Sequence, residues 1–201
     1  MTLTFFTHPR SRSRSARWML EEIGAPYESV VIDFDKKPAA LIEANPLGKV
    51  PVIVHDGQVV SEAAAICAYL AEAFPEAGLA PRGDERAAYY RWLFFTSGPL
   101  ESAMVDKALG VQVPPEREGM VGYASFARAV DAFERALEGR DFVAGDRFTA
   151  ADVFVGSAVG FFTGFGLLEP RETFMAYLDR VRTRPAWQRA NDIDDALLKG
   201  K

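Results

Sequence analysis

A turn rich in proline and glycine leads directly into a short apolar strand in the first half of the chain. The turn is NPLGKVP at residues 45–51, and the strand that it delivers runs from Val50 to Val54. Proline at a strand entrance has no N–H to donate to the sheet ladder, so part of that strand edge is left free. If the Val50–Pro51 peptide bond is cis, the N–H and C=O of Val50 point outward, where an extended peptide can pair with them.

A second segment, EAAAI at residues 62–66, begins eleven positions after Pro51 and predicts a helix N-terminus. Glu62 stands in the first turn and small residues follow, so a ligand can approach the first backbone N–H groups. The helix dipole favours a carboxylate at this end, and the Glu62 carboxylate can bind an amine. A free strand edge beside an anion site and a carboxylate suits a small peptide that carries both charges.

These two segments, together with two others, give the chain a resemblance to the glutathione transferases that covers nearly all of its 201 residues. The resemblance is to the bacterial, serine-dependent type with the cytosolic fold. All four segments occur in the order that the family shows, which is a much stronger signal than any one of them. They are SRSRSARWMLEEIGAPYE at 11–28, NPLGKVPVI at 45–53, EAAAICAYLAEAFP at 62–75, and TAAD at 149–152 before an apolar helix.

The resemblance implies two domains. Residues 1–75 alternate short strands and helices in the order β-α-β-α-β-β-α, which is the thioredoxin-like arrangement of an α/β glutathione-binding domain. Asp56 and Gly57 predict the hairpin turn between the last two strands. Residues 76–83 predict a linker. Residues 84–201 show only helical patterning, which predicts an all-α helical-bundle domain at the C-terminus.

Three local signals predict where helices begin, bend or end. Gly24 predicts the end of the first helix, and Pro99 predicts a kink or break inside an otherwise helical stretch. Thr149 and Asp152 form a relative of the capping box before the apolar run that ends near Phe165. For this motif we favour a structural interpretation, the cap of a buried helix, and the resemblance agrees with it.

Composition narrows the classes of function. A net charge of −5 argues against a nucleic-acid partner or a basic membrane-surface protein. No run of eighteen apolar residues and no signal-peptide pattern occurs, so we expect a cytoplasmic protein that does not bind a membrane. One cysteine and two histidines argue against an internal disulfide and against a metal site. Cys67 lies in an apolar helical run, which indicates a packing residue and not a nucleophile.

The resemblance also implies a chemistry, in which the protein lowers the pKa of the glutathione thiol so that the thiolate attacks an electrophile. A hydroxyl donor near the sulfur and a helix N-terminus can together shift that pKa by about one to two units. Families of this fold take the donor from a tyrosine at the end of the first strand, or from a serine or cysteine in the following loop. This strand ends in FFT at residues 5–7, and no cysteine lies near positions 11–13, which leaves a serine type.

Ser11 is the favoured thiol-activating residue, and Ser13 is the next candidate. A hydroxyl one or two residues before a helix can face a ligand that lies across the helix end, although either serine can instead simply cap the helix. Arg12 is the arginine that we expect to hold an anionic part of the ligand or to raise the acidity of the thiol. Its alternative is a solvated basic edge. His8, which precedes Pro9 near the same loop, could also contact the ligand, but we favour a partly exposed loop histidine.

The remaining glutathione-binding residues are carried over from the resemblance one by one. Lys49 matches the residue that reaches the glycine carboxylate, Val50 matches the backbone pairing position, and Pro51 matches the cis-proline. Glu62 matches the acid near the γ-glutamyl amine. The family usually has a serine or threonine next, whose hydroxyl binds the γ-glutamyl carboxylate, but this chain has Ala63. Backbone N–H groups remain at this position, while a hydrogen bond worth about 0.5–1.5 kcal/mol is missing.

Two classes of function stay open, because a fold does not fix a function. The resemblance implies an enzyme, active in detoxification, that uses glutathione as a co-substrate against a small hydrophobic electrophile. The alternatives are a glutathione-dependent isomerase or reductase, or a non-catalytic binding or regulatory protein on the same scaffold. The two serines favour an enzyme, whereas Ala63 favours the non-catalytic alternative. The resemblance also implies a homodimer, which two-fold pairing allows.

Overall fold

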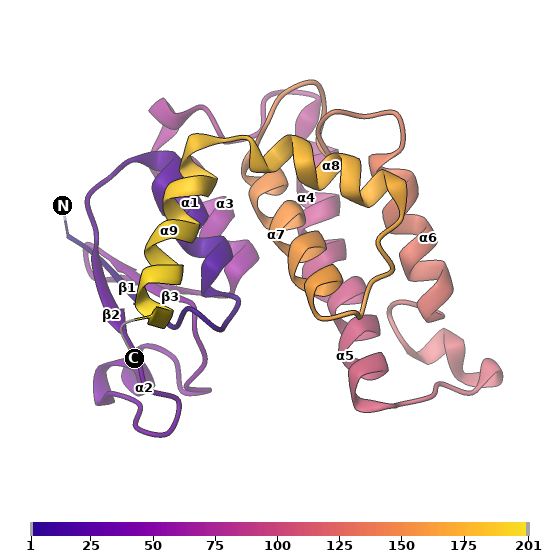
Figure 1. Cartoon of the computed structure of the whole chain (residues 1–201), viewed down its shortest axis with the longest axis horizontal. Coiled ribbons are helices and arrows are strands. Elements are labelled where there is room, and N and C mark those ends of the chain that lie inside the picture. Colours follow the sequence, from indigo (N-terminus) through magenta and orange to yellow (C-terminus); the bar gives the residue numbers. More distant parts are fainter. Residues whose placement is uncertain (1, 200–201) are drawn as a thin grey trace. The chain divides into compact units, whose positions relative to one another are not determined.

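The computed structural model describes residues 2–199, which form two compact units. One unit contains the residues up to 80 together with residues 183–199, and the other is Pro81–Arg182. Figure 1 labels the helices and strands in chain order. Among the described residues, no helix has both the length and the apolar character needed to cross a membrane.

The first unit is built on a four-stranded sheet with the strand order β2-β1-β3-β4. Figure 1 labels the first three of these strands. β1 pairs with β2 in parallel and with β3 in antiparallel orientation, and β3 pairs with β4 in antiparallel orientation. With three helices between and after the strands, this arrangement confirms the predicted thioredoxin-like fold. The strands are β1 (Leu3–Thr7), β2 (Glu28–Val31), β3 (Val52–His55) and β4 (Gln58–Ser61). The helices are α1 (Ser13–Ile23), α2 (Ala39–Ala44) and α3 (Ala63–Ala73).

Successive side chains of β1 and β3 point to opposite faces of the sheet, and both faces are apolar. Phe6 and Val52 are paired across the strands and pack with Leu41 of α2. Their neighbours Phe5 and Ile53 are also paired and fully buried, and they point to the opposite face. On that face the guanidinium of Arg17, in α1, lies 5.2 Å from the centre of the Phe5 ring. The sheet is therefore covered on both faces, and its functional surface must lie at an end.

Two of the predicted turn signals are found where the sequence places them. α1 ends at Gly24, which has φ 66° and donates its N–H to the carbonyl of Leu20 over 3.1 Å. Asp56 and Gly57 form the hairpin turn between β3 and β4, with φ values of 47° and 82°. Left-handed conformations at both central positions are those of the tight hairpin turns that match the twist of the flanking strands.

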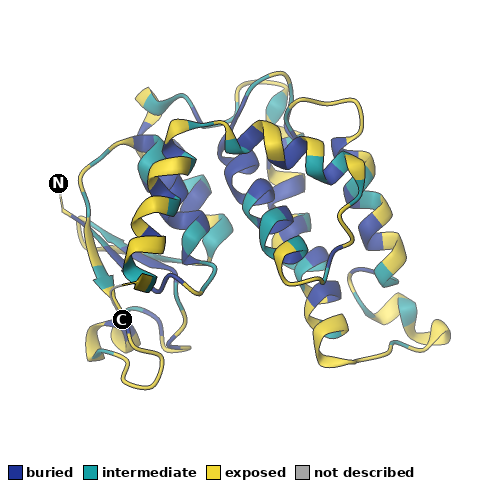
Figure 2. Cartoon of the chain, in the orientation of Figure 1, coloured by how far each residue is buried: buried dark blue, intermediate teal, exposed yellow. Residues whose placement is uncertain are grey.

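The last helix, α9 (Pro185–Lys199), belongs to the first unit, where it packs against α1. The sequence-based division placed residues 84–201 in one helical domain, and the structure divides the chain differently at this point. The reason is a set of polar side chains that join the two helices, among them a buried ion pair between Arg17 and Asp194. The outer face of α9 is exposed (Figure 2).

The second unit is all-helical, as predicted. The interruption expected at Pro99 is a π-helical turn, Thr96–Leu100, between two α-helices. The capping-box prediction is also confirmed, because the N–H of Thr149 donates to Asp152 Oδ2 over 2.8 Å at the start of a largely buried helix. The α-helices of this unit are α4 (Glu85–Phe95), α5 (Glu101–Leu109), α6 (Phe126–Leu137), α7 (Ala150–Gly164) and α8 (Glu172–Arg182).

Candidate functional site

Three segments of the first unit meet at one end of the sheet because of the strand register. Phe6, near the end of β1, pairs with Val52 at the start of β3, and Val52 pairs with Ser61 at the end of β4. The loop after β1, the turn before β3 and the start of α3 are therefore neighbours. Every residue predicted for the site falls in one of these segments: Ser11, Arg12 and Ser13 in the first, Lys49, Val50 and Pro51 in the second, Glu62 and Ala63 in the third.

The hydroxyl groups of Ser11 and Ser13 lie in contact at the N-terminus of α1. Ser11 Oγ is 2.7 Å from the carbonyl oxygen of His8 and 2.8 Å from Ser13 Oγ. The N–H of Ser13 donates to Ser11 Oγ over 3.1 Å. Because a hydroxyl carries one proton, Ser11 can donate to the His8 carbonyl while Ser13 donates to Ser11. Three groups thus position Ser11 Oγ, and a rotation about its C–O bond turns its proton toward another acceptor.

The two serines differ in how far they are buried. Ser13 is fully buried, whereas Ser11 is partly exposed. Burial therefore favours Ser11 over Ser13 as the residue that contacts a ligand. Arg12 occupies the N-cap position of α1 and is also partly exposed. Ser15 has a structural role, since its hydroxyl donates to the carbonyl of Arg12 over 2.7 Å.

His8 is packed into the fold at the beginning of the loop between β1 and α1, residues 8–12, which we call the serine loop. It is only 7% exposed, and its ring centre lies 4.0 Å from that of Phe34. Its Nδ1 accepts the N–H of Arg10 over 3.1 Å, and its carbonyl accepts the N–H of Ser11 over 3.1 Å. His8 therefore holds the backbone that carries Ser11. Periodicity could not reveal this role, because Phe34 lies in the irregular segment between β2 and α2.

Asn45, which the sequence reasoning did not single out, organises the turn before β3. Its side-chain amide donates to the carbonyl of Lys49 over 3.1 Å, and its side-chain oxygen accepts the N–H of Leu47 over 3.2 Å. Its backbone carbonyl accepts the N–H of Gly48 over 2.7 Å. These bonds close the turn. The Asn-Pro pair at its start was the available signal, since asparagine side chains commonly hydrogen-bond the backbone two residues on.

The closed turn places Lys49 on the surface and Val50 ahead of the strand ladder. The ladder between β3 and its neighbours begins at Val52, two residues after Val50. The Val50–Pro51 peptide bond is cis. Lys49 is exposed and Val50 is partly exposed, while Pro51 is buried. The backbone groups of Val50 thus lie outside the paired part of the sheet, next to an exposed cation.

A second cation, Lys37, lies against the same turn. Gly48 has φ 61°, and a side chain at this position would lie 3.2 Å from Lys37 Nζ. It would also lie 3.0 Å from Ile42 Cδ1. The positive φ favours glycine at position 48, and a side chain there would force Lys37 and Ile42 to move. The sequence reasoning assigned only Lys49 to a carboxylate, and Lys37 adds a positive charge beside it.

The start of α3 combines an unusual backbone conformation with helix N–H groups. Glu62 has φ 68° and ψ 120°, in the left-handed half of conformational space that favours glycine. The first hydrogen bond of α3 runs from the N–H of Ile66 to the carbonyl of Glu62 over 2.9 Å. The N–H groups of Ala63 and Ala64 precede this bond and have no acceptor within the helix. Such outliers cluster at ligand sites, and these donors suit a carboxylate.

Two other groups of the first unit, the Cys67 thiol and the Tyr27 hydroxyl, are poorly suited to act on a ligand. Burial raises the pKa of the Cys67 thiol to about 12, so Cys67 is no nucleophile at neutral pH. Burial also raises the pKa of Tyr27 to about 12, with a further contribution from the hydrogen bond that its hydroxyl donates to Glu21. Its hydroxyl is committed to that bond. Neither Cys67 nor Tyr27 therefore replaces Ser11 as the candidate donor.

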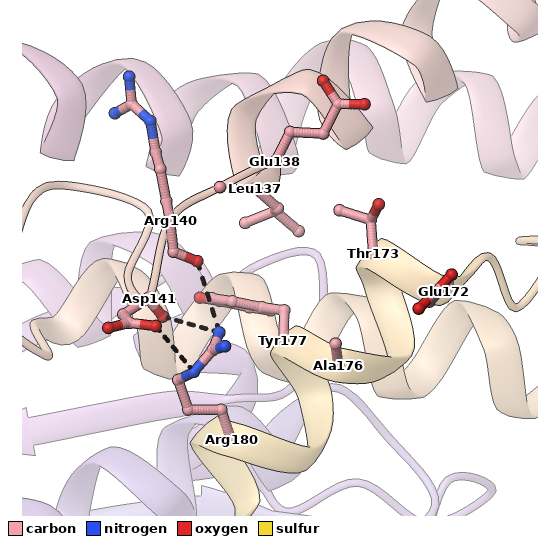
Figure 3. A pocket seen from close by; sticks show the side chains of 10 residues that line it. Leu137, Glu138, Arg140, Asp141, Glu172, Thr173, Ala176, Tyr177 and Arg180 are labelled. Atoms are coloured by element: carbon pink, nitrogen blue, oxygen red, sulfur yellow. Dashed lines mark hydrogen bonds and ion pairs between the residues drawn. The ribbon is translucent and has the colours of Figure 1, made fainter.

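A surface hollow of about 410 Å³ lies within the second unit, between the end of α6 and the side of α8 (Figure 3). Tyr177 contributes to its floor, and its hydroxyl donates to Asp152 over 2.8 Å. Arg180 forms an ion pair with Asp141 over 3.2 Å and contacts two backbone carbonyls of the turn (Figure 3). None of the predicted site residues lines this hollow.

The fold and the serine loop define a thioredoxin-like protein with an appended helical domain. Residues 1–72 match the glutathione S-transferase N-terminal domain, and residues 71–180 match the glutathione S-transferase C-terminal domain. The second match alone spans more than half of the chain. The chain therefore belongs to the glutathione S-transferase family.

Individual relatives are distant in sequence and similar in structure. Glutathione S-transferase F10 of Arabidopsis thaliana is 25% identical over 205 residues, which include 94% of this chain and 95% of the relative. A crystal structure of a glutathione transferase from Methylococcus capsulatus is 27% identical, with a TM-score of 0.80 over 97% of this chain and 100% of the other. A sphingomonad glutathione S-transferase complexed with glutathione is also 27% identical, with a TM-score of 0.78 over 96% and 98% of the two chains.

Proposed function

We propose that this protein binds glutathione at the end of the sheet and activates its thiol for attack on a small hydrophobic electrophile. The observation that carries the proposal is the hydroxyl of the partly exposed Ser11, held between the His8 carbonyl and Ser13 at the N-terminus of α1. Family membership and the glutathione complex of the sphingomonad relative support the same ligand. Glutathione is then consumed as a co-substrate.

The tripeptide is held through its backbone and its two charged ends. The backbone of glutathione pairs with Val50, outside the strand ladder. Its glycine carboxylate lies near the cations Lys49 and Lys37, while its γ-glutamyl amine binds the Glu62 carboxylate. The γ-glutamyl carboxylate binds the N–H groups at the start of α3, beginning at Ala63. This last contact lacks the usual side-chain hydroxyl, which weakens glutathione binding but leaves the backbone donors in place.

The chemical step needs a thiolate at the Ser11 hydroxyl. Ser11 turns its proton from the His8 carbonyl to the sulfur, and the hydrogen bond stabilises the negative charge. Ser13 donates to Ser11 Oγ at the same time, which makes Ser11 a stronger donor. The positive end of the α1 dipole, with Arg12 beside it, acts in the same direction. The thiol proton leaves to solvent before the attack. The thiolate sulfur then forms a bond to the electrophilic carbon while the bond from that carbon to its leaving group breaks, and with an aryl halide the halide ion leaves to solvent.

Ser11→Ala is expected to raise the pKa of the thiol in bound glutathione by about one to two units, because it removes the hydrogen bond to the sulfur. Glutathione affinity should change little, since Lys49, Val50 and Glu62 hold the rest of the tripeptide. The measurement is the thiolate absorbance of the bound complex against pH, together with the rate of conjugation to an activated aryl halide.

Ser13→Ala is the matched control, since it removes a neighbouring hydroxyl that a ligand cannot reach directly. It should shift the thiol pKa less and should cost about 1 kcal/mol of stability if Ser13 also supports the helix start. An unshifted titration in Ser11→Ala with a shifted one in Ser13→Ala would transfer the role to Ser13. Two unshifted titrations would contradict serine activation altogether.

A non-catalytic binding or regulatory protein is the second candidate function, and Ala63 is the observation that favours it. Without a hydroxyl at this position, the γ-glutamyl carboxylate has only backbone donors. A glutathione-dependent isomerase or reductase would use the same thiolate on another substrate. Retention on immobilised glutathione without conjugation would favour these alternatives, whereas absence of both retention and turnover would overturn the proposed transferase.

We also propose that the protein is a homodimer, as the family resemblance implies. Tyr90 and Phe94 lie one helical turn apart on α4, and Phe94 is 70% exposed. An apolar surface of this kind suits burial against a second copy. Light scattering at micromolar concentration should give the mass of two chains, and Phe94→Asp should shift it toward one. Phe165→Asp, at a similarly exposed phenylalanine, is the control that should keep the dimer. A single-chain mass for the unmodified protein would contradict the proposal.

A further inference from the structure

A row of polar contacts joins α9 to one face of α1. Arg14, Arg17 and Glu21 are spaced by three and four positions, so they lie on one face of α1. Their contacts with α9 run along most of the length of α1. They are Arg14 with Asn191 and Asp195, Arg17 with Asp194, and Glu21 with Arg189, while Glu22 pairs with Arg184 just before α9 begins.

Arg14 differs from the others because its guanidinium also reaches the serine loop. Its Nε donates to the carbonyl of Pro9 over 2.8 Å, and its Nη1 donates to Asn191 Oδ1 over 3.0 Å. Its Nη2 forms an ion pair with the carboxylate of Asp195. Asn191 is itself fixed on α9, since its amide donates to the carbonyl of Trp187 over 2.8 Å. One planar group thus links two residues of α9 to the loop between β1 and α1.

The Pro9 carbonyl is the acceptor through which Arg14 holds that loop. Pro9 follows His8 and precedes the residues that lead to Ser11, and its ring leaves it without an N–H to donate. The loop is fixed on one side by the bonds of His8 to Arg10 and Ser11. The bond from Arg14 to Pro9 fixes it on the other side. A charged donor makes this hydrogen bond stronger than one between neutral groups.

We propose that α9 positions the Ser11 hydroxyl, with Arg14 as the link between them. Arg14 is a positioning residue, because it acts on the loop and not on the ligand. Activation of a thiol needs a donor held to within a fraction of an ångström, and a loop alone is a poor support for such a group. The helix at the end of the chain therefore serves the site at its beginning. This inference rests on the proposed function for its catalytic consequence, while the ordering of the loop can be measured independently.

Arg14→Gln and Arg189→Gln form a matched pair of variants that test this link. Both remove an arginine contact between α1 and α9, but within residues 2–199 the polar contacts of Arg189 are with Glu21 alone, through its carboxylate and its carbonyl. Amide hydrogen exchange at Arg10 and Ser11 measures the order of the loop without any ligand. The pKa of the bound glutathione thiol and the separate values of kcat and KM measure the effect on catalysis, and thermal unfolding measures stability.

Arg14→Gln should accelerate exchange at the Arg10 and Ser11 amides by about tenfold or more, since it removes a charge-assisted hydrogen bond. It should raise the pKa of the bound thiol by roughly half a unit and lower kcat about threefold to tenfold, with KM for glutathione nearly unchanged. Arg189→Gln should alter none of these. The same changes are expected when Asn191 and Asp195 are both replaced by alanine, because Arg14 then loses its support on α9.

Equal exchange rates in Arg14→Gln and the unmodified protein would overturn the inference. So would equal effects of Arg14→Gln and Arg189→Gln, which would indicate only a general loosening of the two helices. Failure of the proposed function looks different. In that case the unmodified protein shows no thiolate titration, while the selective loss of protection in Arg14→Gln still supports the link between α9 and the loop.

Discussion

Asp152→Ala is expected to lower the free energy of unfolding of the helical unit by about 3–5 kcal/mol. The carboxylate is fully buried and accepts four hydrogen bonds. Oδ1 accepts from the N–H of Val143 and the hydroxyl of Tyr177, both over 2.8 Å. Oδ2 accepts from the N–H of Thr149 over 2.8 Å and from its hydroxyl over 3.0 Å. Alanine leaves these buried donors without an acceptor.

The loss is smaller than the sum over four donors, because the variant also removes the cost of burying a carboxylate. Burial raises the pKa of Asp152, and the hydrogen bonds from Val143, Thr149 and Tyr177 oppose that rise. The two effects therefore offset each other in part. Chemical denaturation of the full chain, followed through the helical signal, measures the difference in unfolding free energy.

Two control variants test whether the loss of stability comes from the hydrogen bonds of Asp152 and not from substitution in this region as such. Tyr177→Phe removes one of the four donors and should cost about 1 kcal/mol. Asp146→Ala, at an exposed acid in the segment before α7, should stay within about 0.5 kcal/mol of the unmodified protein. If Asp152→Ala lost less than 1 kcal/mol, the carboxylate would not be the anchor that its contacts indicate.

The cap at Asp152 shows which parts of the fold can be predicted from the sequence. Its partner Thr149 is three residues away, so the motif is visible as a local pattern. The helix end at Gly24 and the hairpin turn at Asp56 and Gly57 are predictable for the same reason. Each depends on the conformations that one or two residues allow, and tertiary contacts do not have to be known.

The sequence indicates which three segments form the candidate site, but not how their side chains are arranged. The serine loop, the turn before β3 and the start of α3 carry recognisable residues, and strand register brings them to one end of the sheet. The different burial of Ser11 and Ser13 was not predictable, because both stand at the same helix end. It depends on how α1 lies against the rest of the unit.

Contacts between residues far apart in the chain, or inside irregular segments, could not be predicted from the sequence. Phe34 covers His8 and Lys37 approaches Gly48 from a segment without periodicity. The position of α9 was missed for a related reason. Its amphipathic pattern predicts a helix with one inward face, but the pattern does not say which unit that face contacts.

Asp194→Ala is expected to destabilise the first unit by about 3–5 kcal/mol, because it leaves a buried guanidinium without its counter-charge. The side chains of Asp194 and Arg17 are each 1% exposed, and Arg17 Nε donates to Asp194 Oδ1 over 2.7 Å. Arg17 also donates to the hydroxyl groups of Tyr27 and Ser29, over 3.1 and 3.3 Å. These neutral acceptors cannot replace the carboxylate.

A double-mutant cycle tests whether the unpaired charge is the cause. Arg17→Met combined with Asp194→Leu removes both charges and keeps apolar volume, so it should be less destabilised than Asp194→Leu alone. Arg189→Gln, which breaks an ion pair between the same helices whose arginine is exposed, should cost less than about 1 kcal/mol. A double variant as unstable as Asp194→Leu would mean that the contacts of Arg17 with Tyr27 and Ser29 carry the stability instead. Since Arg14 donates to the Pro9 carbonyl while Asp194 pairs with Arg17, stability and positioning of the serine loop should respond to different residues of the same pair of helices.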